Sequence, residues 1–173
     1  TTAVEHASVG SPLTFLEDMG FDVVRIPTGS DGVVDVDRLV DEVDDDTIIV
    51  SVMYVNNEIG AVMPVEEIAR RIKEKNPSVL FHVDAIQAFG KYVIYPKRMG
   101  IDMMSISSHK FHGPKGVGAL FIKDRVKVKP VIYGGGQQGG GRLLFAALHA
   151  FHEKFRVGVA VTPVSYTHLT LPT

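Results

Sequence analysis

Apolar residues fall in short runs separated by polar and glycine-rich segments. Runs bounded by turn signals predict strands over residues 21–26, 47–54, 79–84, 103–107 and 118–122. Apolar residues at helical spacing predict helices over residues 11–19, 35–43 (starting at 35 or 37) and 64–75. The segment at 64–75 also has acidic residues near its start and basic residues near its end, which complements the helix dipole. Helices that alternate with strands reading as continuous apolar runs predict an α/β fold, a mainly parallel sheet with helices on both faces.

Polar residues stand just past the ends of three of these strands. Asn57 follows the strand at 47–54, Asp84 ends the strand at 79–84, and Lys110 follows the strand at 103–107. In a parallel sheet, ligands gather at the carboxyl ends of the strands. The sequence therefore predicts that these three side chains line one cleft.

The surroundings of Lys110 are unusual for a solvated lysine. It lies between His109 and His112, after an apolar run and before the rigid Gly113-Pro114 turn. This placement suits an amine that bonds covalently to an aldehyde. A buried carboxylate such as Asp84 needs a cationic partner, and the N–H of a pyridinium ring is such a partner. Together the two residues indicate pyridoxal phosphate, whose ring accepts electrons from a carbanion.

Several blocks of residues follow one another along the chain: His6, Asn57, the Asp84-x-x-Gln87 pair, Ser107-x-His109-Lys110 and Gly134-Gly135-Gly136-Gln137. Their order and spacing resemble the cysteine desulfurases, within the class V, fold type I pyridoxal-phosphate enzymes. The resemblance covers roughly residues 1–138, which would form part of the cofactor-binding large domain of such an enzyme.

The resemblance implies a role for each residue around the cofactor ring. Lys110 would carry the cofactor covalently and move protons during catalysis. Asp84 would pair with the ring nitrogen, and Gln87 and Asn57 would contact the ring oxygen. His6 would stack on the ring and assist in proton transfer.

By the same resemblance, Ser107 and His109 would hold the cofactor phosphate. Simpler interpretations remain open, since these two residues could be ordinary polar groups at a strand end and Asp84 could cap a helix. The glycines at 113–118 lack the Gly-Lys-Ser/Thr ending of a phosphate loop and precede an apolar strand, unlike a dinucleotide fingerprint. A metal site built from His109 and His112 is disfavoured because Gly113-Pro114 forbids a helix there.

Composition sets outer bounds on function. The 173 residues have a formal net charge of −2 and include no cysteine. Disulfides and thiolate metal sites are therefore excluded, and no basic run with interleaved aromatics indicates nucleic-acid binding. No apolar run approaches the length of a membrane span and no signal peptide is visible. Because the chain starts at Thr1 and we expect it to be a fragment, the absent signal carries little weight, and a cytoplasmic location is the default expectation.

The resemblance ends near Gln138. We expect residues 139–173 to be an unmatched tail, produced by a frameshift and, over the last ten residues, derived from a sequencing adapter. The family's sulfur-accepting cysteine lies far downstream and is missing, so we expect this chain to be an incomplete desulfurase core, inactive alone. The parent would be a homodimer that takes cysteine and passes sulfur to acceptor proteins. Three alternatives to a cysteine desulfurase core remain: a selenocysteine lyase, an aminotransferase, or a non-catalytic fragment that binds the cofactor.

Overall fold

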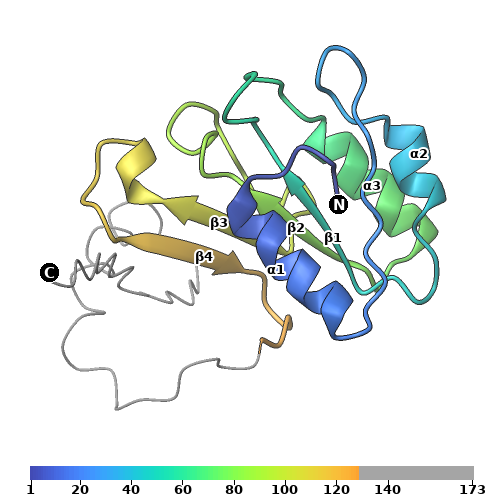
Figure 1. Cartoon of the computed structure of the whole chain (residues 1–173). Coiled ribbons are helices and arrows are strands. Elements are labelled where there is room, and N and C mark those ends of the chain that lie inside the picture. The colour runs from blue at the N-terminus through green and yellow to red at the C-terminus, as the bar shows by residue number, and fades with distance from the viewer. Residues whose placement is uncertain (129–173) are drawn as a thin grey trace, which may run out of the picture.

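A four-stranded sheet organises residues 1–128, the part of the chain that the computed structural model describes (Figure 1). Its strands stand in chain order, and β1 to β3 are parallel while β4 pairs antiparallel with β3. The strands are β1 (Ile49–Met53), β2 (Leu80–Asp84), β3 (Met103–Ser107) and β4 (Gly118–Ile122). The expected mainly parallel sheet is confirmed, and all four strands fall within one or two residues of their predicted bounds.

One face of the sheet is apolar and packs against helix α3 (Val65–Lys75). Val52, Phe81 and Val83 are fully buried there and form one cluster with Ile68 and Ile72 of the helix. The helix has Glu66 and Glu67 in its first turn and two lysines in its last, an order that complements the helix dipole. Burying a side chain of this size contributes about 1.5–3 kcal/mol, so this face holds the fold together.

The opposite face carries polar side chains, contrary to the expectation of continuous apolar strands. The His82 ring bonds through Nδ1 to the Ser51 hydroxyl and through Nε2 to the Ser105 hydroxyl, each at 2.8 Å. The three residues lie on neighbouring strands: Ser51 stands opposite His82, and Ser105 stands two residues beyond Met103, the residue opposite His82 on β3. Because both ring nitrogens are bonded, a half-buried histidine is accommodated without a charged partner.

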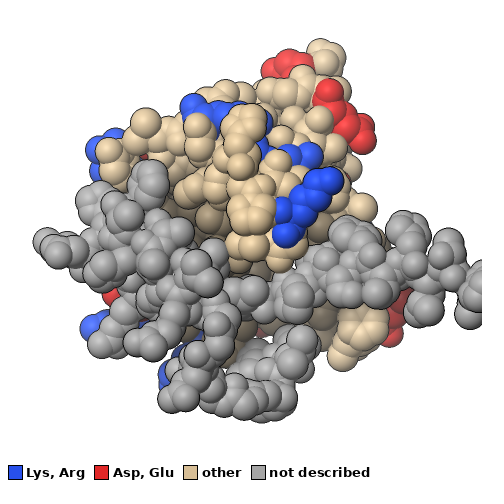
Figure 2. Space-filling model, turned by 90° about the vertical axis from the view of Figure 1, so that its left-hand side faces the viewer, with Lys and Arg blue, Asp and Glu red and all other residues tan. Residues whose placement is uncertain are grey.

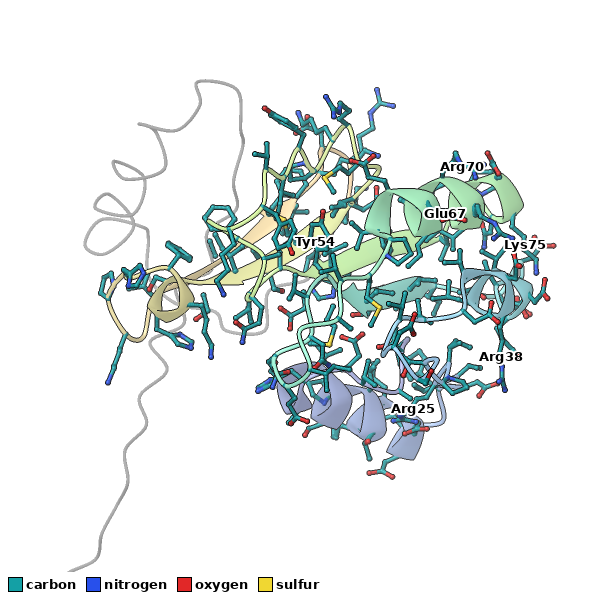
Figure 3. The ribbon with its side chains drawn as sticks, turned by 90° about the horizontal axis from the view of Figure 1, so that it is seen from above. Arg25, Arg38, Tyr54, Glu67, Arg70 and Lys75 are labelled. Atoms are coloured by element: carbon teal, nitrogen blue, oxygen red, sulfur yellow. The ribbon has the colours of Figure 1, made fainter. Side chains whose placement is uncertain are left out.

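Helix α1 (Ala7–Asp18) lies on the side of the sheet away from α3 (Figure 3). It begins four residues before the predicted start, because the His6 side chain caps it by accepting a hydrogen bond from the Ser8 N–H. The Gly10-Ser11-Pro12 stretch, which reads as a turn, lies inside the helix. None of its residues is buried, and Phe15 is 63% exposed.

The strand predicted over residues 21–26 is wrong. Ile26 forms only an isolated bridge with Thr2, so this apolar run has no neighbouring strand to extend it. Helix α2 (Val36–Asp41) follows, and Asp35 caps it as expected by accepting from the Arg38 N–H. No helix in residues 1–128 is long and apolar enough to cross a membrane.

Candidate cofactor site

The candidate site lies at the carboxyl edge of the sheet, where β1, β2 and β3 all end. β4 starts at the same edge, because Ser107 pairs with Gly118. The segments that follow the three parallel strands carry Asn57, Gln87 and Lys110 respectively. The topology thus brings together at one edge residues more than 50 positions apart in the sequence.

Asp84 is the most constrained of these residues. It is 4% exposed, and its Oδ1 accepts a hydrogen bond from the Ile86 N–H at 2.9 Å. Burial raises the pKa of its carboxyl above the ordinary value, although the Ile86 N–H and the charge of His6 both act to lower it. One carboxylate oxygen of Asp84 therefore caps a turn, and the alternative interpretation of Asp84 as a helix cap is wrong because residues 85–102, between β2 and β3, form no helix.

No lysine or arginine in residues 1–128 forms a salt bridge with Asp84, in contrast to the other buried aspartate, Asp102. A buried carboxylate without a salt-bridge partner is costly. A pyridinium N–H would supply such a partner, so the chemistry of Asp84 fits the ring nitrogen of pyridoxal phosphate.

His6 lies beside Asp84 at the start of α1. Its ring is exposed, and its Nδ1 is 3.1 Å from the Ser8 nitrogen and 2.8 Å from the Ser8 hydroxyl oxygen. Its charge acts to lower the pKa of the Asp84 carboxyl, against the larger effect of burial. The residue that caps α1 is therefore near enough to the aspartate that ends β2 for their charges to interact.

Glu5 is a residue for which the sequence indicated no role. Its Oε1 accepts hydrogen bonds from the Thr2 hydroxyl at 2.6 Å and from the Met53 N–H at 2.9 Å. Burial raises the pKa of its carboxyl, and Asp84 contributes to the rise. Glu5 thus fastens the segment that carries His6 to the end of β1. The only sequence signal was its position next to His6.

Lys110 closes a short 3-10 helix, Ser108–Lys110, directly after β3, and its side chain is exposed. Ser107 and His109 lie together, with the Ser107 hydroxyl 2.7 Å from His109 Nδ1. Ser108, which no sequence pattern indicated, is the buried member of this group, and its N–H donates to the Val117 carbonyl at 2.9 Å.

Gln87 and Asn57 complete the set at the same edge. Gln87 is half-buried, with its Oε1 3.5 Å from Lys91 Nζ. Asn57 is exposed, whereas its neighbour Asn56 is buried and stabilises the turn. Asn56 Oδ1 accepts from the Glu58 and Ile59 N–H groups and shapes the turn. The side chain of Asn57 is therefore left open to solvent at the edge of the sheet.

Basic residues predominate in the second part of the described chain. Residues 85–128 contain two acidic residues and eight basic ones, namely Lys91, Lys97, Arg98, Lys110, Lys115, Lys123, Arg125 and Lys127. Figure 2 views the molecule from the side of the β3–β4 loop, and lysine and arginine side chains are visible on the upper part of this face. Among these basic residues, Lys110 and Lys115 lie in the segment between β3 and β4, close in sequence to Ser107 and His109, and positive charge there favours an anionic group such as a phosphate. Lys123 instead pairs with Asp102 at the opposite end of the sheet. No three His, Asp or Glu side chains in residues 1–128 are grouped to hold a metal ion.

Comparisons with known proteins identify the family. The family described as Aminotransferase class-V matches residues 1–165, so the chain belongs to the class-V aminotransferase family. Its curated relatives include the cysteine desulfurase IscS of Clostridium botulinum, which is 49% identical over 142 residues. A mitosomal cysteine desulfurase of Trachipleistophora hominis is 50% identical over 144 residues.

Solved structures agree with this assignment. A NifS-like protein superposes with a TM-score of 0.76 and 45% identity, covering 79% of this chain and 37% of its own. A structure described as SspA in complex with cysteine gives a TM-score of 0.75 and 38% identity, covering 79% of this chain and 39% of its own. The resemblance drawn from the sequence is confirmed.

The chain spans about a third of the length of the curated relatives it matches. The alignments cover 82% of this chain but 35% of the C. botulinum protein and 32% of the T. hominis protein. The glycine block at 134–137 and the expected tail at 139–173 lie outside the residues that the structure describes.

Proposed function

We propose that this chain carries the cofactor-binding core of a pyridoxal-phosphate-dependent cysteine desulfurase. The observation that supports this most directly is the buried carboxylate of Asp84, which forms no salt bridge within residues 1–128 and stands at the sheet edge where Lys110 also lies. The relatives named as cysteine desulfurases support the same choice within the family.

Each residue has a defined task in this proposal. The Lys110 amine would hold the cofactor covalently and would move the proton at the substrate α-carbon. Asp84 would keep a proton on the ring nitrogen, and His6 would stack on the ring. Bound pyridoxal phosphate supplies an electron-accepting ring that stabilises negative charge at that carbon.

Four further residues orient the cofactor. Gln87 and Asn57 would donate side-chain amide N–H groups to the ring oxygen. Ser107 and His109, already hydrogen-bonded to each other, would bind the phosphate. The domain boundary at residue 138 is part of the same proposal, with residues 1–138 forming a portion of the large domain.

The overall reaction we propose converts L-cysteine and an acceptor thiol into L-alanine and a persulfide. The substrate C–S bond breaks, an S–S bond forms on the acceptor, and a hydrogen replaces sulfur on the substrate carbon. The 173 residues include no cysteine, so the acceptor thiol must come from outside them. We therefore expect no complete turnover by this chain alone. A homodimeric parent that acts in the cytoplasm and passes sulfur to acceptor proteins for iron–sulfur cluster assembly fits the proposal.

Titration of the full 173-residue chain with pyridoxal phosphate tests the proposal. We expect a visible absorbance band that saturates at one cofactor per chain. Lys110→Ala should abolish the band, whereas Lys115→Ala, an exposed lysine of the same loop, should leave it unchanged. A band that survives Lys110→Ala would show that the cofactor is attached elsewhere.

A further inference from the structure

Two aromatic rings join the loop that carries Lys110 to the loop that carries Gln87. Phe89 lies in the segment after β2, and Phe111 follows Lys110 directly. Their ring centroids are 5.0 Å apart with an interplanar angle of 57°, within the range of favourable aromatic pairs. Both side chains are half-buried, so the contact is sheltered although both loops lie at the surface.

The backbone beside this ring pair requires glycine. Gly90 has a φ of +81°, a conformation that residues with a Cβ rarely adopt. A Cβ placed on Gly90 would lie 3.1 Å from the Cβ of Phe111. The two loops therefore approach each other so closely that a methyl group at position 90 would push them apart.

The loop that carries Lys110 is stiff on its own. The Ser108 N–H donates to the Val117 carbonyl, the Ser108 hydroxyl donates to the Pro114 carbonyl, and the Gly113 N–H donates to the Ser108 carbonyl. A Cβ on Gly113 would lie 2.7 Å from the Ser108 Cβ, so this turn is tightly closed. A displacement of Phe111 would consequently move the whole loop and Lys110 with it.

The opposite loop is tied to Asp84. The Asp84 carboxylate accepts the Ile86 N–H, and the N–H groups of Ala88 and Phe89 both donate to the Ala85 carbonyl. Phe89 is thus one turn away from the proposed partner of the ring nitrogen. The aromatic contact connects two stiff loops, one holding the proposed attachment point of the cofactor and the other its proposed counter-charge.

We propose that the Phe89–Phe111 contact is a positioning device that sets the spacing between Lys110 and the Asp84–Gln87 turn, and that Gly90 allows the contact to form. This inference rests on the proposed attachment of pyridoxal phosphate to Lys110. A lysine side chain is long and flexible, so bonding its amine to a bound aldehyde costs conformational entropy. Holding the backbone of Lys110 in place before the bond forms lowers that cost.

The test compares two lysines of the same loop. The full chain is incubated with limiting pyridoxal phosphate and reduced with borohydride, and the label at each lysine is measured by peptide mass spectrometry. In the unsubstituted chain we expect strong preference for Lys110 over the exposed Lys115. Phe111→Leu and Gly90→Ala should each lower the Lys110:Lys115 ratio about tenfold.

Gly20→Ala is the matched control. Gly20 has a φ of +92°, and a Cβ added to it would meet nothing within 4 Å, so its substitution imposes similar backbone strain far from the site. The labelling ratio should then stay unchanged even if the melting temperature falls. If the substitutions only reduced the general stability of the fold, the melting temperature would fall in all three variants and the Lys110:Lys115 labelling ratio would be the same in all three.

The outcomes distinguish the two proposals. If the unsubstituted chain shows no preference for Lys110, the attachment at Lys110 is wrong and the positioning device with it. If Lys110 is preferred but Phe111→Leu and Gly90→Ala retain the full ratio, or Gly20→Ala lowers it equally, the attachment stands and the positioning device is refuted.

Discussion

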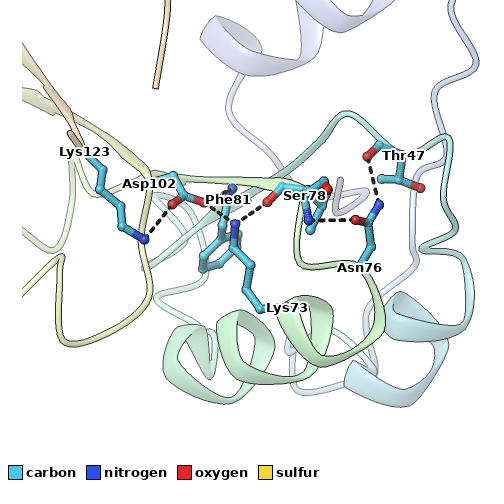
Figure 4. A network of polar contacts seen from close by, with 8 residues as sticks. Thr47, Lys73, Asn76, Ser78, Phe81, Asp102 and Lys123 are labelled. Carbon is cyan, nitrogen blue, oxygen red and sulfur yellow. Dashed lines mark hydrogen bonds and ion pairs between the residues drawn. The ribbon is translucent and has the colours of Figure 1, made fainter. Parts of the chain in front are cut away.

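The Lys73 ammonium lies 2.6 Å from the Asp102 carboxylate, at the end of the sheet opposite the candidate site. Lys123 adds a second ion pair at 3.1 Å, and the Phe81 N–H donates to the same carboxylate (Figure 4). Asp102 and Asp84 are both buried, but among the described residues only Asp102 forms salt bridges with lysine side chains. The fold thus supplies lysines to one buried aspartate, and we propose that a bound ligand supplies the positive charge for the other.

Asp102→Asn should destabilise the chain by about 2 kcal/mol. Burial alone would raise the pKa of Asp102, but hydrogen bonds from Lys73, the Phe81 N–H and Lys123 outweigh it and lower that pKa. The stabilisation is therefore present above the ordinary carboxyl pKa and is lost as pH falls. Urea unfolding at about pH 7 and about pH 3 measures this. An equal effect of the substitution at both pH values would contradict the assignment.

Asp84→Asn should leave the free energy of unfolding at neutral pH unchanged or slightly higher. The pKa of Asp84 is raised by burial, so its charged form costs stability above the ordinary carboxyl pKa, and asparagine removes that cost. The same substitution should weaken pyridoxal-phosphate binding at least about tenfold, because a charge-assisted hydrogen bond is lost. Chemical unfolding and absorbance titration measure the two effects. Unaltered cofactor affinity would argue against a ring-nitrogen partner.

His82 should make the fold sensitive to mild acid. Burial lowers the pKa of the His82 ring from 6.5 to about 4. At a pH between these two values, the ring is protonated in the unfolded chain but not in the folded chain. Stability therefore falls as pH drops from 6.5 to about 4, by at most about 3 kcal/mol. His82→Gln keeps a polar side chain without this titration. The difference in unfolding free energy between the two proteins, measured across that range, should shrink with falling pH; a constant difference would contradict the prediction.

Glu5→Ala should cost about 1–2 kcal/mol, because the Met53 N–H and the Thr2 hydroxyl lose their shared acceptor. Glu5→Gln retains an oxygen at that position and should cost much less. Denaturant unfolding compares the two variants. If glutamine destabilised as much as alanine, the carboxylate charge and not the hydrogen bonds would hold the N-terminal segment in place.

The sequence predicted the strands well because each is an apolar run closed by a turn signal. The run at 21–26 has a similar appearance, but a strand needs a neighbouring strand to pair with, and Ile26 forms only an isolated bridge with Thr2. Helix α1 was placed too late because Gly10-Ser11-Pro12 resembles a turn, whereas the cap at His6 had already started the helix. Local signals cannot reveal which distant segment is available as a partner.

The candidate site was located from the rule that ligands meet at the carboxyl ends of parallel strands, and Asn57, Asp84 and Lys110 do follow three such strands. Contacts between distant segments could not be predicted in this way. The link from Glu5 to Met53 and the Phe89–Phe111 pair both join residues more than 20 positions apart, and neither leaves a periodic signal in the sequence.

A crystal structure of the full chain with pyridoxal phosphate tests the central claim most directly. We predict continuous density from Lys110 Nζ to the cofactor and a ring nitrogen about 2.7–3.2 Å from an Asp84 carboxylate oxygen. Cofactor density that is joined to another lysine, or a ring nitrogen that faces away from Asp84, would contradict the account.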